Sequence, residues 1–279
     1  MTTLYQFNKK FWTYTLLCTF SLLLFSCEDV VEVDLSSSDN RLVVDAEILW
    51  ETNTPGNVQQ IYLSRLTNYY EDETQKVSGA QVEITNANGT IFSFIETETP
   101  GTYQCNNFVP ELHANYELQV IVDDEIYTAT ENLVSTPEIT RVEQADDGGF
   151  SEDNYEITFY FNDPIAEENY YLEDFQTDIL IYPQYGISSD NFFNGNEVDF
   201  SFSDEDLEIG STIHTRFRGI SKQFHNYMSL VLESTSANPF STPPANIRGN
   251  LINETNEDNY ALGYFSLSQV EKFSYTIEE

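Results

Sequence analysis

Apolar residues recur at every second position along several segments of this chain, and this period restricts the possible fold more than any other feature. From Leu42 to Trp50 the even-numbered residues are apolar, whereas Asp45 and Glu47 stand between them. Such alternation is typical of a half-buried β-strand, and it predicts that Trp50 lies in the core. Further strands are expected at 58–65, 80–86, 91–95, 116–122 and 125–130. A turn at Pro100-Gly101 is expected to lead into Tyr103. Turn signals separate them, so residues 41–134 are predicted to form a β-sandwich domain.

The second half of the chain is also rich in expected strands. Residues 155–161 alternate in the same way, and shorter patterns occur at 179–182, 198–202 and 213–217. Composition changes at 133–153, where Asp146-Asp147-Gly148-Gly149 is expected to be a loop, so the domain boundary is placed near Val134. Residues 221–233 instead show helical spacing, with Ser221 as N-cap. The predicted fold class is mostly β: two β-sandwich-like domains, the second (135–279) with one short α-helix.

That helix is expected to pack on the second domain's sheet through residues at positions i, i+3, i+4 and i+7. These are Phe224, Tyr227, Met228 and Val231. No other substantial helix is expected after the first 26 residues.

The first 26 residues are predicted to be a signal peptide. Lys9 and Lys10 precede an apolar run of 15 residues, Phe11–Phe25. This run is shorter than the ~20 residues of a membrane-spanning helix. Ser26-Cys27 then resembles a bacterial lipoprotein processing site, which requires a thiol to carry the lipid. We expect Cys27 to be lipidated and residues 27–40 to form a tether; a plain secretory signal with a chance cysteine is the alternative.

Acidic residues follow Cys27 directly, at Glu28 and Asp29. This arrangement resembles the surface-export signal of Bacteroidota lipoproteins, although a solvated tether would also be acidic. The expected location is therefore the outer membrane, lipid-anchored and exposed at the cell surface. Cys18 lies in the signal, so Cys105 is the remaining thiol and is expected to be a small buried residue rather than a nucleophile or half of an intramolecular disulfide.

Charge excludes one class of partner. The chain has 47 acidic against 11 basic residues, a formal net charge of −36, and such a field repels nucleic acid. Aromatic residues make up 14 %, which is too many for a disordered acidic chain.

The sequence contains no recognisable catalytic or cofactor motif, so no catalytic residue, metal or cofactor is expected. The three histidines, His113, His214 and His225, are isolated and are interpreted as structural or exposed. Acidic runs at 71–73, 204–208 and 257–258 are interpreted as solvated surface rather than Ca²⁺ ligands. A hydrolase that uses a carboxylate pair is the least favoured functional alternative.

Two sets of residues resemble known families. Val77-Ser78-Gly79-Ala80, Gly101-Thr102-Tyr103 and Tyr116-Glu117-Leu118 resemble the transthyretin-like, carboxypeptidase-regulatory-like sandwich. His113 stands where that pattern has a glycine, and histidine tolerates the positive φ of such a turn better than most residues.

The second set is Asn238-Pro239-Phe240-Ser241, Asn246-Ile247-Arg248-Gly249-Asn250 and Leu262-Gly263-Tyr264-Phe265. With the preceding helix and Cys27, it resembles the domain of unknown function numbered four-two-four-nine, a family of Bacteroidota outer-membrane lipoproteins. The resemblance implies a cell-surface location and genes often near TonB-dependent transporters. It implies no activity and no catalytic residues.

These observations favour a binding function. We expect an accessory subunit of a TonB-dependent nutrient-uptake system, with neutral or basic cargo. A free-standing glycan- or peptide-binding lipoprotein is the alternative. Tandem aromatics are the candidate contact residues, because one ring of each pair would face solvent: Tyr69 and Tyr70, and Phe192 and Phe193, with Tyr170-Tyr171 a further pair.

Overall fold

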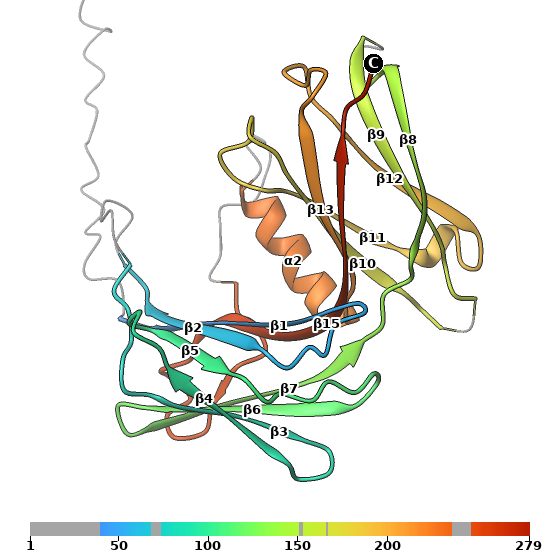
Figure 1. Ribbon diagram of the computed structural model, residues 1–279. Coiled ribbons are helices and arrows are strands. Elements are labelled where there is room, and N and C mark those ends of the chain that lie inside the picture. Colours follow the sequence, from blue (N-terminus) through green and yellow to red (C-terminus); the bar gives the residue numbers. More distant parts are fainter. Residues whose placement is uncertain (1–39, 68–73, 151–152, 166, 236–246) are drawn as a thin grey trace, which may run out of the picture. The chain divides into compact units, whose positions relative to one another are not determined.

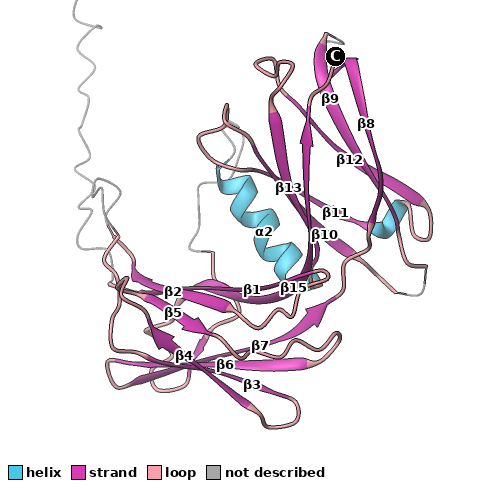
Figure 2. Cartoon of the chain, in the orientation of Figure 1, coloured by secondary structure: helices cyan, strands magenta, loops and turns pink. Residues whose placement is uncertain are grey.

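The computed structural model describes residues 40–67, 74–150, 153–165, 167–235 and 247–279. The predicted signal peptide, Cys27 and nearly all of the predicted tether lie outside the described residues, as do Tyr69 and Tyr70. The described residues are mostly β with one α-helix, so the predicted mostly-β fold class is confirmed (Figure 2).

The first half of the described chain consists of seven strands. They are β1 (Leu42–Glu51), β2 (Gln59–Arg65), β3 (Gln81–Asn86), β4 (Ile91–Glu96), β5 (Thr102–Cys105), β6 (Asn115–Val122) and β7 (Glu125–Val134). Burial alternates along β1, β2 and β6, as the period of two requires. Gly89 has a φ of +79° in the turn between β3 and β4, and Asp123 and Asp124 have positive φ between β6 and β7, in agreement with the turn signals between the expected strands.

The second half adds eight strands and one short 3₁₀ helix. The strands are β8 (Ile139–Gly148), β9 (Asn154–Asn162), β10 (Tyr170–Gln176), β11 (Gln184–Ser189), β12 (Glu197–Ser203), β13 (Thr212–Gly219), β14 (Ile252–Asn253) and β15 (Leu262–Thr276), and the 3₁₀ helix is η1 (Asp190–Phe192). β12, β9 and β8 form a three-stranded sheet. All other strands belong to one sheet in the order β11-β10-β13-β15-β1-β2-β5-β4-β3-β6-β7-β14.

β15 connects the two halves of this sheet (Figure 1). Its first part pairs in parallel with β1, and its second part pairs antiparallel with β13. β15 also pairs with β7 at Leu267 and Ser268, which closes β1–β7 and β15 into a ring of strands. Phe265 and Leu267 pack in the core of this ring, whereas Tyr275 packs in the core between the two sheets of the second half. One face of β15, carried by its odd-numbered residues, therefore contributes to both cores.

Helix α2 (Lys222–Thr235) agrees closely with the predicted helix. Ser221 Oγ accepts a hydrogen bond from the Phe224 backbone N–H at 3.1 Å, so Ser221 is the N-cap as expected. Phe224 is buried, and Tyr227 and Met228 pack with it against Leu172 and Tyr264 of the large sheet. Val231 is only half-buried.

Three expectations from the sequence were wrong. Residues 179–182 are not a strand; they lie in the turn between β10 and β11. Residues 146–148, expected to be a loop, belong to β8. Trp50 is half-buried at the margin of the ring's core, where its indole N–H donates to the Thr54 carbonyl at 2.8 Å, because β1 is close to its end there.

The predicted domain boundary near Val134 falls at the end of β7, and the next strand begins at Ile139. Residues 38–279 cluster as one compact unit, since β15 is shared. The division into domains 41–134 and 135–279 stays a prediction.

Candidate functional site

A charged cleft lies on the face of the large sheet that carries α2. It has a volume of about 590 Å³, within the range of small-molecule sites. Its lining comes from β1, β2, β11 and β13 and the residues beside them: Asp45, Glu47, Leu49, Val58, Gln59, Gln60, Tyr62, Tyr185 and Arg216. On β1 these are the odd-numbered positions, because the even-numbered ones fill the core of the ring.

Strand register explains why charged residues meet in this cleft. Tyr185, Asp174, Arg216 and Lys272 are successive partners across β11, β10, β13 and β15. Cross-strand partners point to the same face of a sheet, so these side chains form one row. Residues far apart in the sequence are thereby brought together.

Arg218 is buried at the centre of a charged cluster whose other members are Glu47, Asp174 and Arg216. Its side chain is 1 % exposed, yet it carries a full positive charge. Nη1 donates to Oε2 of Glu47, and Nη2 donates to Oδ2 of Asp174, each at 3.2 Å. Arg218 therefore joins β1 to β10 and neutralises part of the negative charge of both strands. Nε of Arg218 has no hydrogen-bond partner within the described ranges.

Arg216 lies two residues before Arg218 on the same face of β13, and it lines the cleft. Its Nε donates to both carboxylate oxygens of Asp174, at 2.9 and 3.0 Å, and about a third of its side chain is exposed. Its two terminal nitrogens form no hydrogen bond with any residue that the structure describes. Asp174 thus holds the guanidinium in place while leaving its outer edge available.

Acidic groups face Arg216 from β1. The walls of the cleft displace water around Asp45 and so raise the pKa of its carboxyl group, and repulsion from Glu47 raises this pKa further. Arg218 acts in the opposite direction but does not cancel these effects. Asp45 forms no hydrogen bond or ion pair with another described residue.

Two tyrosines complete the cleft. Tyr62 and Tyr185 are 45 % and 37 % exposed, and the Tyr62 hydroxyl donates to Oε1 of Gln60 at 2.7 Å. Burial raises the pKa of Tyr185, as does the nearby charge of Asp174. The cleft therefore combines one available cation, two carboxylates and two half-exposed rings.

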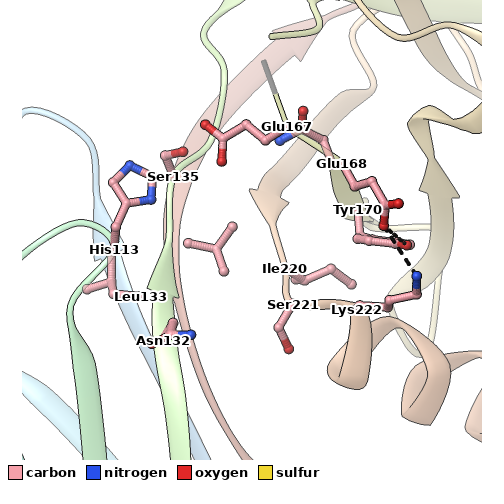
Figure 3. A pocket seen from close by; sticks show the side chains of 12 residues that line it. His113, Asn132, Leu133, Ser135, Glu167, Glu168, Tyr170, Ile220, Ser221 and Lys222 are labelled. Atoms are coloured by element: carbon pink, nitrogen blue, oxygen red, sulfur yellow. Dashed lines mark hydrogen bonds and ion pairs between the residues drawn. The ribbon is translucent and has the colours of Figure 1, made fainter. Parts of the chain in front are cut away.

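A second pocket of about 320 Å³ lies beside the start of α2. Figure 3 shows His113 on one side of it and Lys222 on the other. Lys222 Nζ contacts Oε2 of Glu168 at 3.2 Å, and the Tyr170 hydroxyl donates to the same oxygen at 3.1 Å. Lys222 and Tyr170 accordingly lower the pKa of Glu168. Because these charges satisfy one another, this pocket is the weaker candidate of the two.

The comparisons with known proteins identify a family. Residues 28–274 match the family described as "Domain of unknown function (DUF4249)". The chain belongs to this family. No curated protein matches the chain significantly.

Solved structures resemble the DUF4249 chain only distantly. A two-domain fibronectin type-III segment of chicken tenascin has 10 % identity and a TM-score of 0.22, over 57 % of this chain and 83 % of that one. A chain of a cytokine receptor complex has 11 % identity and a TM-score of 0.26, over 66 % and 86 % of the two chains. A DUF4785 protein of Legionella pneumophila has 11 % identity and a TM-score of 0.24, over 64 % and 50 %.

The structure places one of the two aromatic pairs proposed as contact residues. Phe192 ends η1 and is 98 % exposed, while Phe193 packs against the buried rings of Phe161, Tyr171 and Phe217. One ring of the pair therefore faces solvent and the other packs inward. The Tyr170-Tyr171 pair follows the same rule, because Tyr171 is buried and Tyr170 is not.

Several single residues also have defined places. Cys105 is buried and free, and His113 has a φ of +64° in the turn before β6, as expected for both. His214 lies on β13 and His225 on α2. Within the described ranges, no group of three or more His, Cys, Asp or Glu side chains is arranged to hold a metal ion. No helix in the described part of the chain has the length and hydrophobicity needed to span a membrane.

Sequence reasoning missed the charged cleft. The alternation of Ile213, Thr215 and Phe217 indicated a strand, but Arg216 and Arg218 on its other face went unused. Two arginines at this spacing stand out in a chain with 11 basic residues. That pattern was the available signal.

Proposed function

We propose that this chain is a surface-exposed outer-membrane lipoprotein that acts as a binding or accessory subunit of a TonB-dependent nutrient-uptake system. The observation that carries the proposal is Phe192, a fully exposed aromatic side chain at the end of η1. Aromatic residues, phenylalanine included, are enriched at the buried centres of protein interfaces, so this ring supports a protein partner.

The turn that presents Phe192 is well ordered by hydrogen bonds. The Asp190 carbonyl accepts from the backbone N–H groups of Phe193 and Asn194, both at 2.9 Å. The buried Asp163 carboxylate accepts from the Gly195 N–H at 2.8 Å and from the Tyr171 hydroxyl at 2.6 Å. A side chain on a preorganised turn loses less entropy on binding, which favours affinity.

A second apolar side chain extends this surface. Ile165 is exposed, and a Cβ atom at Gly195 would lie 2.8 Å from its Cγ1, so Ile165 packs over the backbone at Gly195. Phe192 and Ile165 therefore project from adjoining loops, which the Asp163 N–H joins by donating to the Asn196 carbonyl at 3.0 Å. Two exposed apolar side chains on adjoining loops are better suited to bind a protein surface than a small molecule.

The N-terminal features support the location. A lipidated Cys27 would hold the folded unit at the membrane, where a transporter is the available large partner. Acidic residues after Cys27 support export to the cell surface. The net charge of −36 favours neutral or basic cargo, because it repels polyanions.

Affinity purification from native outer membranes tests the proposal. A TonB-dependent transporter is expected to co-purify with the wild-type lipoprotein, and Phe192→Ala is expected to reduce its recovery at least about tenfold. Phe150→Ala is the matched control, because Phe150 is also fully exposed but lies after β8. If no transporter co-purifies with the wild type at low salt, the accessory role is wrong. Equal recovery with Phe192→Ala would keep the partner and reject this contact.

A free-standing peptide- or glycan-binding lipoprotein is the second candidate, and the charged cleft favours it. Such a protein would bind ligand without a transporter, with a change in tyrosine fluorescence from Tyr62 or Tyr185. A hydrolase is the third candidate and would turn over members of a peptide or glycoside substrate panel.

A further inference from the structure

We propose that the charged cleft binds a small zwitterion, with a carboxylate on Arg216 and an ammonium group on Asp45 and Glu47. Free amino acids and short peptides with both ends free share this chemistry. The inference rests on the proposed function only in that the bound molecule would be cargo. Binding in the cleft itself is measurable without a transporter.

The carboxylate position follows from how Arg216 is held. The single Nε–H of Arg216 donates one bifurcated hydrogen bond to the two carboxylate oxygens of Asp174, which holds the guanidinium beside that residue. Arg216 lines the cleft, and its terminal nitrogens have no hydrogen-bond partner among the described residues. Arginine recognises carboxylates through paired N–H groups, and this geometry leaves one such pair free.

The ammonium position follows from the acids on β1. Arg218 contacts Oε2 of Glu47, whereas Oε1 of Glu47 makes no hydrogen bond within the described ranges. Asp45, two residues earlier on the same face, has no partner there either. Partial desolvation raises its pKa, and a bound cation would relieve this cost.

The two positions are close together because Arg218 links them. Its Nη1 and Nη2 contact Glu47 and Asp174 respectively, and Asp174 in turn holds Arg216. The acids of β1 and the available arginine of β13 therefore line the same cleft. Opposite charges within one small cleft match a molecule that carries both charges, rather than a large polymer.

Charge balance excludes simpler ligands. An anion would meet Asp45 and Glu47 as well as the overall negative field of the protein. A cation would leave the terminal nitrogens of Arg216 unpaired in a partly dehydrated cleft, at a cost in binding energy. A zwitterion satisfies both sets of groups, and the half-exposed rings of Tyr62 and Tyr185 can cover its apolar atoms.

Equilibrium dialysis with mass spectrometry tests this inference on the purified full-length lipoprotein in detergent. The probes are a mixture of the common amino acids, a mixture of tripeptides with free ends, and the same tripeptides acetylated and amidated at their ends. We expect retention from at least one free-ended mixture, about tenfold above the blocked mixture. The first two probes distinguish an amino acid from a peptide ligand.

Variants assign the binding to the cleft. Arg216→Gln and Asp45→Asn are each expected to reduce retention at least about tenfold, whereas Arg141→Gln, which changes an exposed arginine on β8 outside the cleft, should bind as the wild type. Asp45→Asn keeps the side-chain volume and removes a partly desolvated negative charge, so we expect this variant to fold. It therefore remains informative if Arg216→Gln does not fold.

Three results would overturn the inference. These are no retention by the wild type, equal retention of blocked peptides, and retention that is unchanged in both cleft variants. Loss of peptide binding with a transporter still co-purifying would reject only the ligand. Peptide binding without a transporter would reject only the accessory role.

Discussion

Gly186 on β11 lies directly across from Glu173 on β10, and a Cβ atom at position 186 would stand 2.2 Å from Oε1 of Glu173. Glu173 is 9 % exposed and shares a strand face with Tyr171 and Phe175, which pack in the core between the sheets. Its Oε2 has no hydrogen-bond partner among the described residues. The absence of a side chain at Gly186 therefore provides the space for a buried carboxyl group.

Gly186→Ala is expected to destabilise the protein by about 1–3 kcal/mol, because the methyl group collides with a carboxyl group that has little room to move. Urea unfolding measures the change. In Glu173→Ala the space is vacated, so Gly186→Ala should cost much less in that background. Equal costs in both backgrounds would contradict a direct contact between the two residues.

Stability should fall as pH rises from about 4.5 to 7, because of Glu173. Burial raises its pKa to about 7, so the folded protein retains a proton that the unfolded chain releases. At about 1.4 kcal/mol per pH unit, the loss approaches about 3 kcal/mol at neutral pH. Unfolding free energies measured between pH 4 and 8 test this, and Glu173→Gln should flatten the profile. An unchanged slope in that variant would assign the effect to other groups.

Ser221→Ala is expected to destabilise the protein by about 2 kcal/mol. Ser221 Oγ caps α2 and also donates to Oε2 of the buried Glu131 at 2.7 Å, so its removal leaves a helix N–H and a buried carboxylate short of a partner. Ser229→Ala is the control on the same helix, because Ser229 Oγ only donates to the His225 carbonyl. Thermal unfolding of both variants gives the comparison, and similar losses would show that the cap has no special role.

Cys27→Ala is expected to move the protein from the membrane fraction to the soluble fraction. A lipidated cysteine carries two or three acyl chains, and each buried CH₂ contributes about 0.8 kcal/mol to membrane binding. Fractionation with metabolic labelling by a fatty acid measures both effects, with Cys105→Ala as the control. Retention of the alanine variant at the membrane would reject the anchor.

The sequence predicted strands well where one face of the strand is buried and the other is exposed. β1 and β9 show this pattern, since their alternate side chains enter a core. β10 was not predicted because it is buried on both faces, so its apolar residues do not alternate with polar ones. Its buried Glu173 and Asp174 also interrupt the apolar run that a fully buried strand would show. β8 was missed because its burial does not alternate regularly, so its acidic end resembled a loop.

Local sequence patterns could not predict the charged cleft, for a different reason. Glu47, Asp174 and Arg218 meet only because β15 brings β1 and β13 into one sheet. No local spacing encodes such a pairing. Phe192 was identified because a tandem aromatic pair is a local pattern, and its exposure depends on the next residue packing inward.

The shared strand β15 has a consequence for biosynthesis. It follows all the other described strands in the sequence, yet Phe265 and Leu267 help fill the core of the ring formed by β1–β7 and β15, and β1 has β15 as a neighbour along most of its length. N-terminal domains usually fold first while the ribosome is still working. Here β1–β7 cannot complete their core until Phe265 and Leu267 have been made. A nascent chain interrupted before residue 262 would therefore expose apolar surface in both halves, which marks incomplete copies for proteolysis.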